Sequence, residues 1–325
     1  MDHETGVEKV PVIYFGKENM EPGTLSWSKK CNEVRHCFEE YGCFVLVYDL
    51  IPKKLRDDLF NELEQLFDLP TETKAKHTSE MSLFGYTGKL PHLKDFEGIR
   101  LNETANLENV LSFSKLMWPH GNDNFCEIVH EHGKLLTHLD ILLQKMVFES
   151  YNVRNQCGNH IESMAHILRF NKYPAVPEKD IETYVGLQPH TDKSFISILL
   201  QNQISGLQVQ TKASAKWLPV EFLPSSCIII AGEAMTAWSN NKVHSPIHRV
   251  LMAGKETRYS VDTSSYHKGT IHIPEELIDE EYPRCYNPFN HLEFLSFYSK
   301  KRKEFDAGRI QSVSDIIKDF CGVGT

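Results

Sequence analysis

The sequence predicts a mixed α+β fold whose second half forms a β-sandwich or barrel of the jelly-roll kind. After about residue 160, short β-rich runs follow one another, with turn-forming residues between many of them. Before that point, and again after residue 288, apolar residues recur mainly at helical spacing. The 325 residues suffice for one large domain or two modest ones around a substantial core.

The chain is predicted to have four regions. Residues 1–110 form a mixed, mostly helical N-terminal region, and residues 111–157 form connecting helices that include a long one over 123–150. Residues 158–287 form the β-rich core, and 288–325 form a helical tail. The stretch 78–100, which carries Gly85, Gly88, Pro91 and Gly98, is expected to be a loop. The N-terminal elements are strands at 10–15 and 43–48, a helix over 27–41 and a second helix opened by Asp49 and Pro52. The core strands are 166–173, 194–200, 206–210, 226–230, 248–252 and 258–263.

The composition, 41% hydrophobic and 24% charged, indicates an ordinary globular protein. A formal net charge of −9 argues against nucleic acid or an anionic membrane as the main partner. No apolar stretch has transmembrane length, and the polar N-terminus has no signal-peptide core. The eight cysteines include no CxxC pair, so we expect them to be reduced. These features predict a cytoplasmic protein. We also expect a monomer whose partner is a small-molecule substrate.

Two histidines and one aspartate have a pattern typical of a metal site. His190 and Asp192 stand in QPHTDKSF, and His248 stands in SPIHRVL. Iron(II) oxygenases bind their metal through two imidazoles and one carboxylate and leave other positions open. Residues i and i+2 of a strand point the same way, so His190 and Asp192 are predicted to bind one ion together. A jelly roll can bring the strand of His248 beside them.

A second HxD match, His138-Leu139-Asp140, is predicted not to be a metal site. It falls in the long helix, where residues i and i+2 lie about 200° apart around the axis and do not face each other. His138 is therefore expected to be a surface or packing residue. His291-Leu292-Glu293 is followed by no histidine at a useful distance.

Arg258 and Ser260 are predicted to form a carboxylate clamp. They would share one face of a strand, and a guanidinium beside a hydroxyl suits a carboxylate because arginine supplies paired donors. 2-Oxoglutarate needs such a clamp at its far carboxylate while its keto-acid end chelates a metal. Asn171 and Tyr173, in RFNKYP, also share a face and could add polar contacts.

With these motifs in order, the chain resembles the plant 2-oxoglutarate/Fe(II)-dependent dioxygenases. HTD, SNNKVHSPIHRV and RYS match the metal and co-substrate motifs of that family, and RFNKYP resembles its co-substrate-side motif. PVIYF and CFEEYGCFVLVYD resemble its N-terminal domain, so the similarity spans nearly the whole chain. GYTGKLPHLKDFEGI (85–99) and LMWPHGNDNFCEIV (116–129) suggest the branch with glucosinolate side-chain oxidases and steroidal alkaloid hydroxylases. Asp262 departs from the family pattern, in which an apolar or aromatic residue is more usual.

The resemblance implies a double-stranded β-helix core and the use of Fe(II), 2-oxoglutarate and O2, with ascorbate as an activator. Succinate and CO2 would be released while a small plant specialised metabolite or hormone is oxidised. Hydroxylation is expected first, with demethylation, desaturation and ring formation as alternatives; Asp192 argues against halogenation, because related halogenases lack that carboxylate. The implied iron ligands, catalytic through the metal, are His190, Asp192 and His248, and the implied co-substrate residues are Arg258, Ser260, Asn171 and Tyr173.

Substrate contacts are expected from segments that usually line the pocket mouth in this architecture, near 83–100, 262–266 and 289–298. Aromatic lining would suit a hydrophobic metabolite, although ordinary packing explains each of these residues equally well. The sequence leaves the substrate unidentified. His244 and Lys193 lie close in sequence to the metal ligands and are expected either to shape the substrate pocket or to be exposed. The candidates are Phe84, Tyr86, Phe96, Asp262, Phe289, Phe294 and Tyr298.

Two other functions stay open at this point. One is a jelly-roll ligand-binding protein without turnover, and the other is a zinc-dependent hydrolase that uses the same three ligands. The complete metal and co-substrate sets argue against the binding protein. The Arg258/Ser260 clamp has no obvious use in a hydrolase.

Overall fold

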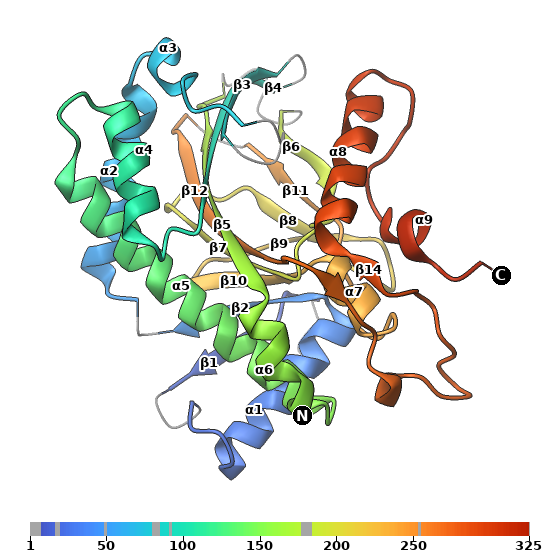
Figure 1. The fold of residues 1–325 in the computed structure, drawn as a ribbon. Coiled ribbons are helices and arrows are strands. Elements are labelled where there is room, and N and C mark those ends of the chain that lie inside the picture. Colours follow the sequence, from blue (N-terminus) through green and yellow to red (C-terminus); the bar gives the residue numbers. More distant parts are fainter. Residues whose placement is uncertain are drawn as a thin grey trace, which may run out of the picture.

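The computed structural model describes residues 8–16, 20–48, 51–79, 85–90, 93–176, 184–252 and 255–324. Two β-sheets form its centre (Figure 1). The large sheet has the order β1-β2-β10-β7-β12-β5-β4-β3, and the smaller one has the order β6-β11-β8-β9. The large sheet consists of β1 (Val12–Phe15), β2 (Cys43–Tyr48), β3 (Gly85–Leu90), β4 (Leu93–Asn102), β5 (Met164–Tyr173), β7 (Ile196–Gln201), β10 (Ser226–Ala231) and β12 (Arg258–His267). The smaller sheet consists of β6 (Val185–His190), β8 (Leu207–Gln210), β9 (Trp217–Pro219) and β11 (His248–Leu251), and a short ladder pairs β13 (Thr270–Ile271) with β14 (Phe289–Asn290).

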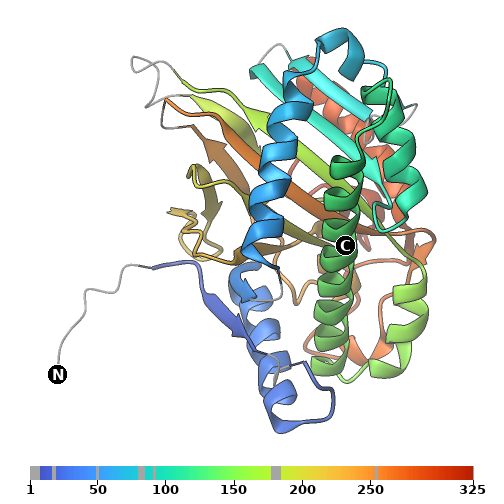
Figure 2. The same cartoon turned by 90° about the vertical axis from the view of Figure 1, so that its left-hand side faces the viewer.

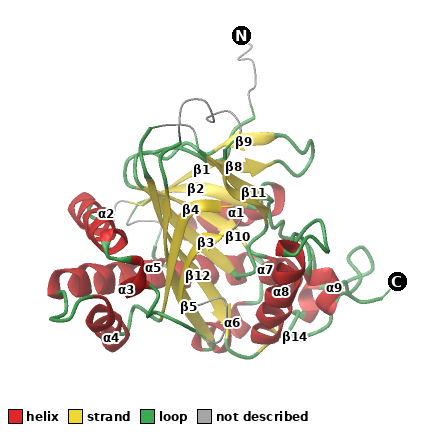
Figure 3. Cartoon of the chain, turned by 90° about the horizontal axis from the view of Figure 1, so that it is seen from above, coloured by secondary structure: helices red, strands yellow, loops and turns green. Residues whose placement is uncertain are grey.

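Helices cover the outer face of the large sheet and one end of the molecule. Figure 2 shows α2 and α5 lying across the large sheet, and Figure 3 shows α8 and α9 on the opposite side of the molecule from α2 and α4. The helices are α1 (Leu25–Glu40), α2 (Lys53–Asp68), α3 (Thr71–Lys74), α4 (Leu107–Met117), α5 (Asp123–Ser150), α6 (Arg154–Glu162), α7 (Glu233–Trp238), α8 (His291–Asp306) and α9 (Ile317–Cys321), with a 3-10 turn η3 (Glu275–Leu277).

Strand alternation separates two apolar clusters on the two faces of the large sheet. Phe170 and Val261 pair across β5 and β12 and belong to the cluster that the helices cover. Tyr173, three positions after Phe170, belongs to a second cluster that also contains Val209 and Val250 of the smaller sheet. Because neighbours along a strand point to opposite faces, β12 packs one set of side chains against helices and turns the other toward the smaller sheet. This arrangement confirms the predicted jelly-roll core with a mainly helical N-terminal region and a C-terminal helix.

The long helix predicted over 123–150 is α5, which begins where the Asn122 side chain accepts a hydrogen bond from the Phe125 amide. The helix predicted over 27–41 is α1. The second helix begins at Lys53, with Pro52 as its N-cap, and Asp49 lies outside the described residues.

The predicted loop at 78–100 is wrong over most of its length. Strands β3 and β4 form an antiparallel pair there, and β4 pairs in turn with β5. The prediction took Gly85 and Gly98 as loop residues, whereas both lie in strands. Gly98 pairs with Asn171 within the ladder, and Gly85, at φ 85°, is the first residue of β3. Together with β1 and β2, these strands extend the large sheet, so the N-terminal region and the β-rich core share one sheet. The division at residues 110, 157 and 287 stays a prediction.

Candidate metal and co-substrate site

His190, Asp192 and His248 meet at one edge of the smaller sheet. His190, the last residue of β6, pairs directly with His248, the first residue of β11. One oxygen of Asp192 lies 3.9 Å from Nε2 of His190 and 3.8 Å from Nε2 of His248. One potential ligand atom from each residue falls within 4.8 Å of the others, a spacing suited to a single ion. Among the described residues, this is the one cluster of three or more such side chains with that spacing.

The predicted convergence of the three side chains is present, but the predicted reason for it is partly wrong. Asp192 does not share a strand face with His190, because β6 ends at His190 and Asp192 lies in the following loop. The loop is held by the helix that follows β10: the Glu233 amide donates to the Asp192 carbonyl at 2.8 Å. Gly232 allows this close approach, since a Cβ there would collide with the carbonyl oxygen of Ser194.

Backbone contacts select the ring nitrogen that each histidine turns toward Asp192. Nδ1 of His190 lies 2.8 Å from the Gln188 carbonyl, and Nδ1 of His248 lies 3.2 Å from the Pro246 carbonyl. A carbonyl can only accept, so each Nδ1 donates and each Nε2 keeps its lone pair on the side of the carboxylate. This tautomer is the one that binds a metal through Nε2.

Electrostatics favour the metal-binding protonation states. Burial, reinforced by His248, lowers the pKa of His190 far below its ordinary value. Burial alone would raise the pKa of Asp192, but His248 and His190 outweigh it and hold that pKa below its ordinary value. Neutral imidazole and ionised carboxylate are the forms that act as ligands, so the set needs little change to accept a cation.

Arg258 lies fully buried on β12 and faces the smaller sheet. Its Nε and Nη2 donate to Oε1 of Gln201 at 3.3 and 2.7 Å, and its guanidinium carbon lies 4.9 Å from the centre of the Tyr173 ring. Its Nη1 is buried and has no hydrogen-bond partner among the residues that the structure describes. A buried guanidinium with a neutral partner and a spare donor is costly unless an anion completes it. The arrangement therefore fits a carboxylate such as that of 2-oxoglutarate.

The other predicted clamp residues lie beside Arg258 in register. On paired strands, Arg258 stands opposite Tyr173 and Ser260 stands opposite Asn171. The Asn171 amide donates to Oγ of Ser260 at 3.3 Å, and the Ser260 hydroxyl also contacts the Tyr173 side chain. The structure thus brings together all four residues of the predicted co-substrate set.

Comparison with known proteins decides the family. The model of the 2OG-Fe(II) oxygenase superfamily matches residues 164–265, and that of the "non-haem dioxygenase in morphine synthesis N-terminal" region matches residues 10–118. An Arabidopsis thaliana protein named "Probable 2-oxoglutarate-dependent dioxygenase AOP1" is 37% identical over 309 residues, which cover 93% of either chain. The chain belongs to the 2OG-Fe(II) oxygenase superfamily. It is a 2-oxoglutarate-dependent dioxygenase of the AOP-like plant branch, and the enzymes of this family use Fe(II) and 2-oxoglutarate.

Solved structures share the fold of this oxygenase. The rice dioxygenase for auxin oxidation superimposes with a TM-score of 0.79 at 22% identity, over 97% of this chain and 100% of its own. The 2-oxoglutarate complex of the corresponding Arabidopsis thaliana enzyme gives a TM-score of 0.75 at 24% identity, over 85% of this chain and 100% of its own. These likenesses confirm the predicted family fold.

The substrate-lining candidates of this oxygenase divide into two groups. Phe96 packs against Tyr173 with ring centroids 5.2 Å apart, Asp262 shares the strand face of Arg258, and the Tyr298 ring lies 5.2 Å from the Lys193 ammonium, one residue beyond Asp192. The other described candidates lie elsewhere. Tyr86 packs against the helix-side cluster and donates to Glu97, while Phe289 and Phe294 join Phe320 in the packing of α8 and α9. Phe84 lies outside the described residues.

The two other motif matches, at residues 138–140 and 291–293, lie on helices α5 and α8. His138 is exposed on α5, whereas Asp140 is buried and bonds to His166 and Ser265. His291 is buried and its Nε2 lies 2.8 Å from the Lys193 carbonyl, so it supports the loop that follows the metal set.

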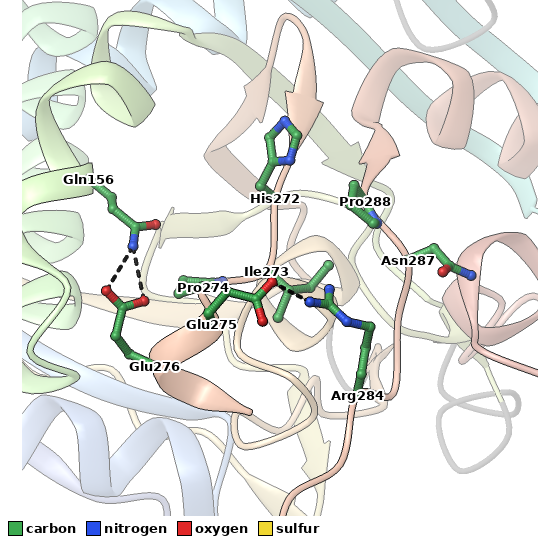
Figure 4. A pocket seen from close by; sticks show the side chains of 9 residues that line it. All are labelled: Gln156, His272, Ile273, Pro274, Glu275, Glu276, Arg284, Asn287 and Pro288. Carbon is green, nitrogen blue, oxygen red and sulfur yellow. Dashed lines mark hydrogen bonds and ion pairs between the residues drawn. The ribbon is translucent and has the colours of Figure 1, made fainter. Parts of the chain in front are cut away.

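A pocket of about 580 Å³ lies apart from the metal and co-substrate residues (Figure 4). Gln156 and Glu276 face each other across it, and Arg284 pairs with Glu275. Its lining includes none of the predicted site residues, and its charged groups already have partners within it. Within the described part of the chain, no helix is long and apolar enough to cross a membrane.

Sequence reasoning missed three residues that shape the site. Gln201 fixes the Arg258 guanidinium, Glu233 holds the Asp192 loop, and Arg169 stands on the same face of β5 as Asn171 and Tyr173. The sequence did hold a signal for Arg169. Arg169 lies two residues before Asn171, as Asn171 lies two residues before Tyr173, and residues at this spacing share one face of a strand. Gln201 and Glu233 carried none, since only the tertiary fold brings them to the site.

Proposed function

We propose that His190, Asp192 and His248 bind the Fe(II) of this dioxygenase and that Arg258 and Ser260, with Asn171 and Tyr173, bind 2-oxoglutarate. The observation that carries the proposal is the direct pairing of His190 with His248, both with Nε2 within 4 Å of one Asp192 oxygen. When bound, Fe(II) and 2-oxoglutarate supply the oxidant by reducing dioxygen, with release of succinate and CO2.

The residues of the chain contribute binding, orientation and charge. The two Nδ1–carbonyl contacts hold the imidazoles in one tautomer, and Asp192 adds the negative charge that a divalent cation needs. Arg258 and Ser260 would fix the far carboxylate of 2-oxoglutarate, so that its other end is turned toward the metal. The buried walls around Arg258 keep water from this contact.

The proposed reaction is the oxidation of a small plant specialised metabolite or hormone, with hydroxylation as the first expectation. Support comes from the AOP-like relatives and from the rice and Arabidopsis thaliana enzymes described as dioxygenases for auxin oxidation. We further propose that the enzyme acts as a cytoplasmic monomer.

The test begins with binding. Purified protein is titrated with Fe(II) and 2-oxoglutarate without oxygen, and binding is followed by calorimetry and by the visible absorption of the iron–keto-acid chelate. Wild type should bind both ligands, and Asp192→Ala should lose the chelate absorption because one of three metal ligands is gone. Normal Fe(II) binding by Asp192→Ala would refute the ligand assignment.

Turnover is then measured as succinate release with oxygen, ascorbate and a plant metabolite extract. Mass spectrometry of the extract distinguishes the gain of an oxygen atom from the loss of two hydrogens or of a methylene unit. Zinc retained in place of iron, with insensitivity to oxalylglycine, would favour the hydrolase instead. Ligand binding without any succinate would favour a binding protein.

A further inference from the structure

A row of charged side chains crosses the large sheet beside the proposed co-substrate residues. Arg100 on β4 stands opposite Arg169 on β5, and Arg169 stands opposite Asp262 on β12. Asp262 lies two positions beyond Ser260 on the strand, so the row points to the same face as the clamp. The charges of Arg169 and Asp192 interact, which puts the row within electrostatic range of the metal set.

Arg169 is held loosely by its neighbours. Its Nε lies 3.6 Å from Oδ1 of Asp262, which is beyond a hydrogen bond, and in the described part of the chain this buried nitrogen has no hydrogen-bond partner. The arginine side chain as a whole is still 28% exposed, so part of it opens onto space. The other Asp262 oxygen accepts from the Asn171 amide at 3.1 Å. Asp262 therefore does not satisfy Arg169 in the way a closed structural salt bridge would.

Arg100 adds a second cation to the row. Its Nη1 donates to Oγ1 of Thr87 at 2.7 Å, and the ion pairs between described residues give it no carboxylate. Burial, reinforced by the neighbouring Arg169, lowers the pKa of Arg100 to about 10. Two guanidiniums side by side repel each other, and a fold bears that cost where an anion is to be bound.

The charges of the proposed site leave a negative charge lacking beside Arg100 and Arg169. Fe(II) and Arg258 together would be neutralised by Asp192 and the two carboxylates of 2-oxoglutarate. Arg100 and Arg169 then face Asp262 alone, which leaves at least one positive charge among the described residues. Burial raises the pKa of Asp262 and outweighs the opposing effect of Arg169. A raised pKa makes this carboxyl less readily negative, so Asp262 does not remove the excess positive charge of the two arginines.

We propose that Arg169 and Arg100 form an anion subsite beside the iron centre, and that the oxidised substrate carries a carboxylate or sulfate group bound there. This inference rests on the proposed function, because it concerns the second substrate of the same site. An oxyanion would accept from both guanidiniums and replace the solvent that now reaches Arg169. Phe96 and Tyr298 add aromatic rings beside the residues of the site, which suit an apolar body, so the class expected is an amphiphilic organic acid.

The experiment uses a plant metabolite extract divided by anion exchange into an anionic fraction and a neutral-plus-cationic fraction. Each fraction is given to the iron-loaded enzyme with 2-oxoglutarate and oxygen, and stimulated succinate release is measured with mass spectrometry of the product. The anionic fraction should stimulate release, and the modified compound should bear a carboxylate or a sulfate, which mass spectrometry distinguishes. Stimulation by the neutral fraction alone, or by neither fraction, would overturn the subsite.

Variants separate an anion subsite from a structural ion pair. Arg169→Gln and Arg100→Gln should each raise the KM for the anionic substrate by about tenfold or more, with a smaller effect on kcat. Asp262→Asn should keep or lower that KM, because it removes the only competing negative charge in the row. A structural Arg169–Asp262 pair predicts instead that Asp262→Asn and Arg169→Gln are equally damaging, and that result would also overturn the proposal.

Two further measurements keep the result interpretable. Arg154→Gln serves as the matched control, because Arg154 is 70% exposed on α6, outside the site, and should leave the substrate KM unchanged. Anaerobic chelate absorption of wild type with Fe(II) and 2-oxoglutarate tests the proposed function separately. Loss of that signal in wild type would refute the iron and co-substrate assignment, whereas a normal signal with no preference for anions refutes the subsite alone.

Discussion

The ammonium group of Lys193 lies 2.6 Å from the carboxylate of Glu233, and both side chains are buried. Lys193 also donates to the backbone carbonyl of Thr191 at 3.0 Å, and the second Glu233 oxygen accepts from the amide of Ile317 at 2.9 Å. The pair therefore ties the loop of Asp192 to α9 at the far end of the chain. This gives Lys193 a structural partner that the sequence did not reveal.

Replacing Glu233 with alanine should destabilise the protein by about 3–5 kcal/mol, because Lys193 would stay buried without a counter-charge. The double variant Lys193→Met/Glu233→Leu should recover much of that loss, since it removes both charges and refills the space. Denaturant unfolding measures each variant. Glu131→Ala, which breaks an exposed pair with Lys134 on α5, is the control and should cost less than about 1 kcal/mol. A Glu233→Ala protein as stable as the control variant would contradict this account.

Arg258→Lys should raise the KM for 2-oxoglutarate by about tenfold or more while Fe(II) binding persists. The planar guanidinium of Arg258 bonds to Gln201 through Nε and Nη2 and leaves its remaining nitrogen, Nη1, for a carboxylate. Lysine lacks this planar group and cannot make both contacts. Steady-state kinetics at varied 2-oxoglutarate and calorimetric titration of the metal check the two halves of the prediction. Arg35→Lys on α1, where Arg35 bonds the Ser150 carbonyl, is the matched control. An unchanged co-substrate KM in Arg258→Lys would count against the clamp.

Gly232→Ala should weaken metal binding and lower stability by about 1–3 kcal/mol, because the added methyl group would collide with the Ser194 backbone and displace the Asp192 loop. Gly158→Ala is the matched control: Gly158 lies within α6, a Cβ there meets nothing within 4 Å, and alanine should add about 0.5–1 kcal/mol. Thermal unfolding and Fe(II) titration measure both variants. Equal Fe(II) affinity in the two alanine variants would show that the close contact does not position Asp192.

His132 should make the protein less stable in mild acid. It is fully buried on α5, its Nε2 donates to the Leu55 carbonyl at 2.9 Å, and burial lowers its pKa to about 4. Its folded pKa lies below the unfolded value of about 6.5, so the unfolded chain binds the proton first as the pH falls. The contribution of His132 to the unfolding free energy is therefore fully present above about pH 6.5 and is lost as the pH falls toward about 4. The loss amounts to about 2 kcal/mol at about pH 5.

The measurement for His132 is the unfolding free energy at about pH 7 and about pH 5. His132→Gln keeps a donor near Leu55 but cannot bind a proton, so the difference between the two pH values should shrink by about 2 kcal/mol. His138→Gln, an exposed position on the same helix, should leave the difference as it is. An identical pH dependence in wild type and His132→Gln would place the acid sensitivity elsewhere.

Periodicity and local chemistry predicted much of the fold. The helix over Asp123–Ser150 and the strand that begins at Arg258 were readable because their apolar and polar positions repeat with the period of the element. The hairpin of β3 and β4 was not readable. Its pairing partner β5 lies more than sixty residues further along the chain, and its glycines have the local character of a loop.

The sequence by itself determined which residues are the candidates for the proposed metal and carboxylate site: His190, Asp192, His248, Arg258 and Ser260. Ligand type and two-residue spacing are local properties, so they survive without a structure. The tertiary structure alone decided that the Asp192 loop rests on Glu233 and Lys193, because those contacts join segments far apart in the chain. It also decided that Arg100 and Arg169 stand side by side, since strand register follows from the packing of whole sheets.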